Sequence, residues 1–146
     1  MSRENIEAAE SVLTEAFNEG RLEVLDEKCA ADFVDHDPIM GDRDKEGVKE
    51  SIAGYRASFP DLTITIEEIF AAGDKVVTRW TGQGTFENEF MGQQPTGQKG
   101  DPINGISIDR FDQDGKVAES WVQWDTLKLM QNIGLAPTGA EAASSG

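Results

Sequence analysis

The chain has 146 residues, of which 28 are acidic and 13 basic, so its formal net charge is −15. This length fits one domain with a sizeable core. Such an acidic surface repels nucleic-acid phosphates and anionic lipid, so neither partner is expected. No segment approaches the ~20 apolar residues of a membrane span. The N-terminal residues lack the apolar run of a signal peptide, which favours a cytoplasmic location.

The first part of the sequence predicts three helices, over residues 3–18, around 22–29 and over 44–59. In the third, Val48, Ile52 and Tyr55 have the spacing of one helix face. Pro60 ends it, because the residue before a proline avoids helical geometry. Cys29 is the only cysteine, so no internal disulfide can form. Cys29 follows Leu22 and Leu25 at a helix-like apolar spacing, so we expect a buried core thiol. No Cys/His cluster has metal-ligand spacing, so no metal is expected.

After Pro60 the apolar period changes from helical to alternating, which predicts strands. A strand begins near Leu62, Gly73-Asp74 turns the chain into a strand over 75–86, and residues 87–102 form a loop. A hairpin follows, turning at 112–115, and then a last short helical segment. We expect one domain over 1–137 and a flexible tail over 138–146. The fold class is α+β, a curved and mostly antiparallel sheet covered by about three N-terminal helices. This leaves a cone open to a small ligand.

Several short segments occur in an order typical of one family. They include Phe33-Val34-Asp35-His36-Asp37-Pro38, Phe59-Pro60-Asp61-Leu62, Gly73-Asp74-Lys75-Val76-Val77-Thr78-Arg79-Trp80-Thr81 and Trp121-x-x-x-Asp125. Over residues 5–137 the chain resembles the SnoaL-like polyketide and ester cyclases of the NTF2-like superfamily. The resemblance implies an NTF2-like cone with a deep pocket. It also implies a cofactor-free enzyme or ligand-binding role, and a dimer or higher oligomer.

The resemblance also locates the residues that carry the family's chemistry. These cyclases move a proton with an aspartate and polarise the substrate with histidines and amides. The histidine and aspartate of the family's last strand fall on Ser120 and Val122, and its facing polar pair falls on Gly105 and Ser107. Valine cannot accept a proton, and serine is a donor but not a base near neutral pH. The family's reaction is therefore in question for this chain.

Strand alternation predicts which hairpin residues line the pocket. If residues 112–115 form the turn, Ser107 faces Ser120 and Gly105 faces Val122. One face then also holds Asp109, Phe111, Ala118 and Trp124. A glycine bulge at Gly115 would shift the pairing by one residue and make Asp125 the leading base. Otherwise we expect Asp125 to cap the segment that begins at Thr126. The opposite, apolar face predicts a homodimer interface.

One acid–base candidate remains in the segment His36-Asp37-Pro38. It is similar to the Asp-Pro context of the proton-transferring aspartate in ketosteroid isomerases, which makes Asp37 the candidate base, with Asp35 as the alternative. His36 either orients Asp37 or pins the loop before Pro38. The candidate ligand contacts are Phe17, Asp35, Trp80, Met91, Ser107, Ser120, Val122 and Trp124.

Three functions fit this sequence. The first is a SnoaL-like pocket protein that binds a small hydrophobic carbonyl compound and catalyses cofactor-free cyclisation or isomerisation. The second is a binding module with the same cone and no turnover, which the replacement of the family's His and Asp favours. The third is an oligomerising structural protein, which predicts a filled pocket.

Overall fold

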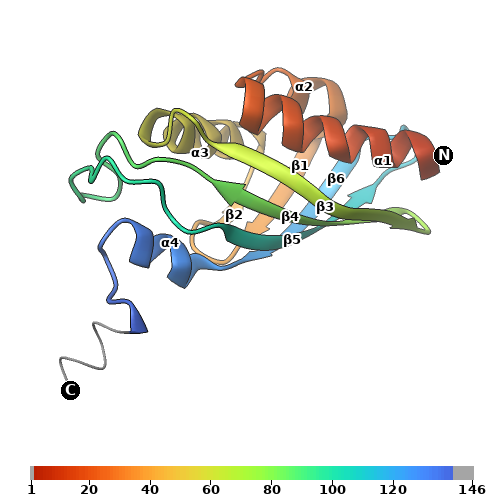
Figure 1. Ribbon diagram of the computed structural model, residues 1–146. Coiled ribbons are helices and arrows are strands. Elements are labelled where there is room, and N and C mark those ends of the chain that lie inside the picture. The colour runs from red at the N-terminus through yellow and green to blue at the C-terminus, as the bar shows by residue number, and fades with distance from the viewer. Residues whose placement is uncertain (1, 140–146) are drawn as a thin grey trace.

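The computed structural model describes residues 2–139 and confirms the predicted α+β layout (Figure 1). The helical elements are α1 (Ser2–Ser11), the π-helical η1 (Val12–Asn18), α2 (Val24–Lys28), α3 (Lys45–Ser58) and α4 (Thr126–Asn132). The strands are β1 (Cys29–Asp37), β2 (Gly41–Arg43), β3 (Thr63–Ala72), β4 (Lys75–Gln83), β5 (Ile103–Phe111) and β6 (Val117–Trp124). Most of the predicted tail, residues 140–146, lies outside the described residues.

The six strands form one sheet in the order β2-β1-β6-β5-β4-β3. Only β1 and β6 run parallel; the other neighbours are antiparallel. The sheet curves beneath α1, α2 and α3, while α4 lies at one end beyond β5 and β6 (Figure 1). The sheet and the helices that cover it thus form the predicted cone.

Local signals explain where the covering helices begin and end. The side chain of Asp44 accepts a 2.8 Å hydrogen bond from the Gly47 amide, which caps α3 at its N-terminus. Gly20 has a φ of +72°, the left-handed conformation that glycine adopts readily after a helix. Asn18, the last residue of η1, exchanges two hydrogen bonds with the backbone of Ile64. These bonds tie the end of the first helical segment to β3.

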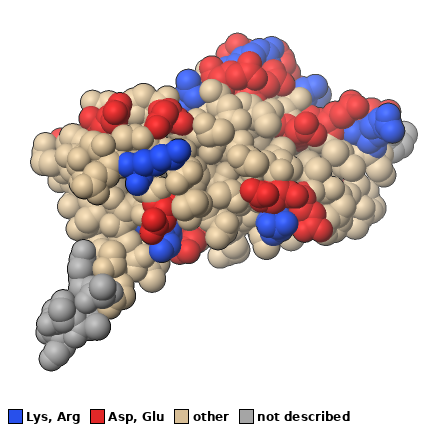
Figure 2. All heavy atoms as spheres, viewed as in Figure 1, with Lys and Arg blue, Asp and Glu red and all other residues tan. Residues whose placement is uncertain are grey.

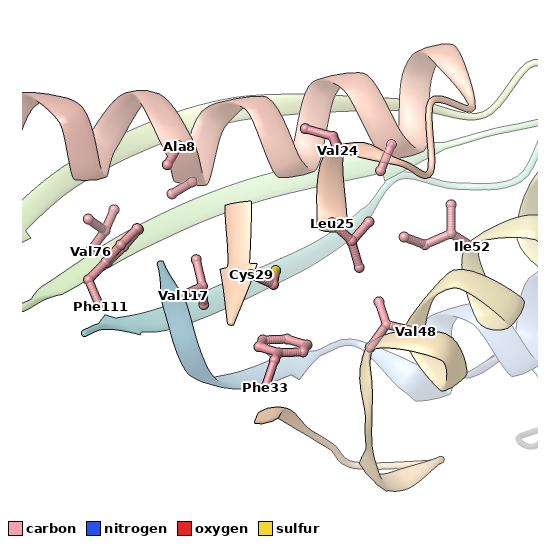
Figure 3. Packing of buried hydrophobic residues seen from close by; sticks show 12 residues of the cluster. Ala8, Val24, Leu25, Cys29, Phe33, Val48, Ile52, Val76, Phe111 and Val117 are labelled. Atoms are coloured by element: carbon pink, nitrogen blue, oxygen red, sulfur yellow. The ribbon is translucent and has the colours of Figure 1, made fainter. Parts of the chain in front are cut away.

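A main core cluster fills the end of the cone beneath α1 and α2 (Figure 3). Its buried residues are Ala8, Ala9, Ala16, Val24, Leu25, Cys29, Phe33, Val48, Ile52, Val76, Phe111 and Val117. Cys29 begins β1 rather than continuing a helix, so the predicted extent of the second helix was wrong at this residue. Burial raises the pKa of the Cys29 thiol to about 12, as suits a core thiol.

A second apolar cluster lies at the other end of the cone. Phe59 and Phe86 stack there with ring centroids 5.5 Å apart, and Leu129 and Ile133 at and just after α4 pack against them. Tyr55 and Trp124 contact the cluster from α3 and β6. The two clusters thus occupy opposite ends of the cone, and the middle of the cone lies between them.

The β5–β6 hairpin differs in register from the prediction but keeps the predicted face. Ser107 pairs with Val122, not with Ser120, and Gly105 pairs with Trp124, not with Val122. One residue of offset arises at the turn, where the Asp112 amide bonds to the Lys116 carbonyl. A second arises from a bulge between Arg110 and Phe111.

The two offsets in this hairpin add to an even number, so alternation returns to its original face. The exception lies between them, where Val117 is buried in place of the predicted Ala118. Ser120, Val122 and Trp124 therefore face inward as expected. Asp125 accepts a 3.0 Å bond from the Lys128 amide and caps α4, so it does not become the pocket base.

The outer surface carries the chain's acidity and some apolar groups. Red acidic side chains are spread over the visible face, many with a blue basic group beside them (Figure 2). Ile106 is 47% exposed and Trp121 37% exposed on the outer sheet face. The homodimer interface expected there stays a prediction. Among residues 2–139, no helix is long and apolar enough to cross a membrane.

Candidate functional site

A cavity of about 180 Å³ lies between the two apolar clusters, enclosed by the sheet, η1 and α3. Apolar side chains make most of its wall, so a bound ligand would lose much of its contact with water. All but two of the predicted site residues line it: Phe17, Asp35, Asp37, Trp80, Ser107, Ser120, Val122 and Trp124. The third functional hypothesis, which requires a filled pocket, does not fit this cavity.

The two exceptions are His36 and Met91, neither of which lines the cavity. His36 points to the opposite face from its neighbours, as strand alternation requires. Its Nδ1 lies 2.7 Å from an Asp42 oxygen and its Nε2 lies 2.7 Å from Glu119. The prediction that His36 orients Asp37 was therefore wrong in its geometry. Met91 is 44% exposed in the loop after β4, because no strand or helix there directs it inward.

The candidate base Asp37 lines the cavity but is surrounded by hydrogen-bond donors. One carboxylate oxygen accepts bonds from the amides of Ile39 and Met40, at 2.8 and 2.9 Å. The other accepts from the Trp124 indole N–H at 3.2 Å and from Arg43 at 3.5 Å. Both oxygens are thus engaged in holding the β1–β2 turn and the Trp124 ring.

Asp35 and Arg43 form a buried ion pair beside Asp37. The Arg43 Nη2 lies 2.6 Å from the Asp35 carboxylate, and their side chains are 13% and 10% exposed. Burial raises the pKa of Asp35, while the hydrogen bond from Arg43 opposes the rise. Arg43 gives no signal in the sequence, because β2 has only three residues, too few for a periodic pattern.

Asp109 is the site residue that the analysis placed on the correct face without assigning it a role. Its side chain is accessible where it borders the cavity. On its other sides it is surrounded by protein atoms. Its Oδ1 accepts a hydrogen bond from the Ser120 hydroxyl. Burial raises the pKa of Asp109 to about 6, the Ser120 bond opposes this, and nearby Asp35 adds to it. The signal that could have revealed it was a carboxylate at an inward position of β5, in alternation with Ser107 and Phe111.

These groups form a row across four strands. Arg43 pairs with Asp35, Asp35 with Ser120, and Ser120 with Asp109, from β2 through β1 and β6 to β5. Adjacent members of such a row have side chains on one face and close enough to interact. Despite the carboxylates, no group of three or more ligating side chains within residues 2–139 is placed to hold a metal ion.

Ser107 and Tyr55 also line the cavity, and each has a hydroxyl group that can donate a hydrogen bond. The Trp80 indole N–H bonds to the Ser107 hydroxyl oxygen at 3.0 Å, so Ser107 acts as acceptor toward Trp80. The Tyr55 hydroxyl forms no hydrogen bond with another described residue, and its ring meets Trp124 edge-on with centroids 6.4 Å apart. Burial raises the pKa of Tyr55 to about 12, with Asp37 adding to the rise, so the phenol stays neutral.

The family model of the SnoaL-like polyketide cyclases matches residues 7–133. The chain belongs to this family. Its NTF2-like cone, cavity and inward-facing β5 and β6 residues are therefore features of a SnoaL-like protein. No curated protein matches the sequence.

Solved structures confirm the NTF2-like fold. AclR from Streptomyces galilaeus, proposed to be a hydroxylase, has 26% identity and a TM-score of 0.84, covering 99% of this chain and 94% of its own. IdmH from Streptomyces antibioticus, proposed to be a polyketide cyclase, has 33% identity and a TM-score of 0.75, covering 89% and 98%. An LEH-like epoxide hydrolase from M. tuberculosis shares the fold at 14% identity and a TM-score of 0.68, covering 99% and 96%. Proteins named for three different reactions share this fold, so the reaction must be argued from the site.

Proposed function

We propose that this SnoaL-like protein binds a small hydrophobic carbonyl compound and transfers a proton on it without a metal or cofactor, in a cyclisation or isomerisation. One observation carries the proposal. A mostly apolar cavity of about 180 Å³ has carboxyl and hydroxyl groups converging on one wall. Removal of a proton from a carbon beside a carbonyl requires a base and a donor to the carbonyl oxygen. The cavity wall contains both kinds of group.

The donors suit a carbonyl oxygen. Ser107 accepts from Trp80, so its own O–H proton remains available to a ligand. Tyr55 presents a neutral hydroxyl from the α3 side. Hydrogen bonds from such donors strengthen as negative charge develops on the oxygen in the transition state, and an apolar surrounding increases their effect.

The charge of the site narrows the ligand class. Asp35, Asp37, Asp101 and Asp109 line the cavity, and Arg43 is the basic residue among its lining groups. Like charges repel, and the whole chain carries a net charge of −15, so an anionic ligand is disfavoured. A neutral ketone or ester fits the cavity better than a carboxylate or phosphate.

The experiment is a thermal-shift screen of neutral aromatic ketones and esters, followed by proton NMR of each binder in D₂O. Binding raises the melting temperature. Turnover is expected to exchange the hydrogens beside the carbonyl faster than buffer does. The absence of any binder would contradict the proposal.

A binding module without turnover is the second candidate, favoured by Val122 at the family's aspartate position. The same NMR measurement separates it from the enzyme, because a module binds its ligand and leaves the exchange rate at the buffer value.

We also propose that the protein is a homodimer through the outer sheet face. The exposed side chains of Ile106 and Trp121 support this, since apolar sheet faces are commonly covered by a partner. Analytical ultracentrifugation of the wild type and Ile106→Lys tests it. A monomeric wild type at micromolar concentration would contradict it.

A further inference from the structure

We propose that Asp109 is the catalytic proton carrier, so that the acid–base carboxyl of this cone lies on β5 instead of on the last strand, where Val122 stands. This inference rests on the function proposed above and names the residue that performs it. Neither the family match nor the similar structures assign a role to this position.

The sheet geometry allows the acid–base carboxyl to lie at position 109 instead of position 122. Val122 pairs directly with Ser107, and Asp109 lies two residues further along β5 on the same face. Diagonal neighbours of this kind are separated by roughly 7–8 Å between backbones, within reach of side chains that extend into a shared cavity. A carboxyl group at position 109 can therefore reach the same part of the cavity as one at position 122.

Four carboxyl groups line the cavity, on Asp35, Asp37, Asp101 and Asp109. Within residues 2–139, Asp109 is the one that forms no ion pair, since Asp35 and Asp37 lie beside Arg43 and the exposed Asp101 lies beside Lys128. Asp37 accepts from four donors on its two oxygens. Asp35 is held by Arg43 at 2.6 Å. Asp109 accepts one bond, from Ser120 to Oδ1, and its Oδ2 has no hydrogen-bond partner within residues 2–139. Asp109 borders the cavity, so its carboxylate, with no cation beside it, can take a proton from a ligand.

The surroundings of Asp109 suit proton transfer near neutral pH. Its pKa of about 6 leaves it ionised at pH 7 while retaining a useful affinity for a proton. The groups that face it are Asp35 and the neutral Cys29 thiol from β1 and Ser120 from β6. Arg43 acts on the site through its bond to Asp35.

The reaction step follows from this arrangement. Asp109 takes a proton from the carbon beside the ligand carbonyl, and the C–H electron pair forms the C=C bond of an enolate. The carbonyl π pair moves to oxygen, where Ser107 donates a hydrogen bond. In an isomerisation, the protonated Asp109 returns the proton to another carbon of the enolate. In a cyclisation, the enolate carbon attacks a second carbonyl of the same molecule, and the proton goes to the new alkoxide.

The test is hydrogen–deuterium exchange at the α carbon of 2-tetralone in D₂O, followed by NMR for the wild type, Asp109→Asn and Asp32→Asn. Asp32 is an exposed β1 aspartate outside the cavity, so its variant controls for the lost charge. We expect Asp109→Asn to lower the enzyme-catalysed rate at least a hundredfold, the scale of a general base, with binding of 2-tetralone retained. Asp32→Asn is expected to match the wild type.

The outcomes are distinguishable. If the wild type accelerates exchange and Asp109→Asn does so equally, the assignment of Asp109 is overturned and the proposed function stands. If the wild type binds 2-tetralone and other ketones without accelerating exchange, both are overturned.

A second variant applies if Asp109→Asn does not fold. Ser120→Ala removes the one donor to Asp109, so the pH midpoint of the exchange rate is expected to rise. An unchanged midpoint in a folded Ser120→Ala protein would overturn the assignment.

Discussion

The indole of Trp80 on β4 lies over Gly105 on β5 and donates a 3.0 Å hydrogen bond to Ser107. It can do so because its strand partner, Gly105, has no side chain. A Cβ at Gly105 would lie 2.2 Å from the Trp80 ring, far inside van der Waals contact. The missing side chain thus sets both the shape of the cavity wall and the hydrogen-bonding state of Ser107.

Gly105→Ala is therefore expected to displace the Trp80 ring from Ser107 into the cavity. Overpacking of this kind typically destabilises a protein by about 1–3 kcal/mol. We expect a loss of unfolding free energy on this scale in urea denaturation, together with weaker binding of the ketones found in the screen. Gly54→Ala in α3 is the matched control.

A Cβ at Gly54 would meet nothing within 4 Å, and alanine favours a helix over glycine by up to about 1 kcal/mol. The control should be neutral or more stable than the wild type. Equal stability and binding for the two variants would show that Trp80 does not need the space at Gly105.

The bond between Trp80 and Ser107 can be measured separately from the ring's packing. Trp80→Phe keeps an aromatic ring and removes the N–H donor, while Ser107→Ala removes the acceptor. A double-mutant cycle on the unfolding free energy should give a coupling of about 0.5–1.5 kcal/mol, the net value of one such hydrogen bond. Additive effects would mean that the two side chains do not interact in solution.

Alternation along β5 and β6 was enough to predict the inward face of the site, and the reason is parity. Beyond the bulge, the hairpin register differs from the expected one by two residues, and an even offset returns the side chains there to their original face. Ser107, Ser120, Val122 and Trp124 were therefore placed on the correct face of the sheet from a wrong pairing. An odd offset would have exchanged the faces and failed for all of them.

Other parts of the site depend on contacts that the local sequence does not encode. Arg43 reaches Asp35 across a three-residue strand that has no periodic signal. The importance of Asp109 depends on its enclosure by three other strands and on Ser120. His36 is different, because alternation with Asp35 and Asp37 already indicated the outer face. The family resemblance of the His-Asp-Pro segment outweighed that signal in the sequence analysis.

Stability should fall with rising pH because of Asp109. The pKa of this carboxyl is about 6 in the folded protein against a reference value of 3.8, so the folded state binds the proton more tightly. Unfolding free energy then decreases as pH rises between these values, by roughly 3 kcal/mol in total if the whole difference is expressed. Asp109→Asn removes this penalty and is expected to stabilise the protein at pH 7.5 and change little below pH 4.

Urea denaturation of the wild type and Asp109→Asn from pH 4 to 8 gives this difference directly. The exposed Asp32→Asn variant controls for net charge. A variant equally stable or less stable than the wild type at pH 7.5 would mean that Asp109 is not destabilised by its surroundings.

Removal of the Arg43 cation from its buried pair with Asp35 should destabilise the protein. Arg43→Met leaves Asp35 and Asp37 without their shared cation, and breaking a buried pair commonly destabilises a protein by about 3–5 kcal/mol. Arg79→Met is the matched control, because the Arg79–Glu68 pair is 52% and 58% exposed. Such exposed pairs contribute about 0–1 kcal/mol. Similar losses of unfolding free energy for the two variants would contradict the buried role of Arg43.

His36 offers a test of the outer sheet face. It is the only histidine, so its Hε1 proton gives a single NMR signal to follow during a pH titration. Hydrogen bonds from its ring to Glu119 and Asp42 raise its pKa above the usual 6.5. The bonds of the protonated His36 ring to Glu119 and Asp42 therefore stabilise the folded protein at pH values below 6.5. This stabilisation is lost as the pH rises through the folded-state pKa of His36. Glu119→Gln should lower the His36 pKa, whereas Glu68→Gln, at the Arg79 pair, should leave it unchanged. A His36 pKa at or below 6.5 in the wild type would contradict the bonds of the ring to Glu119 and Asp42.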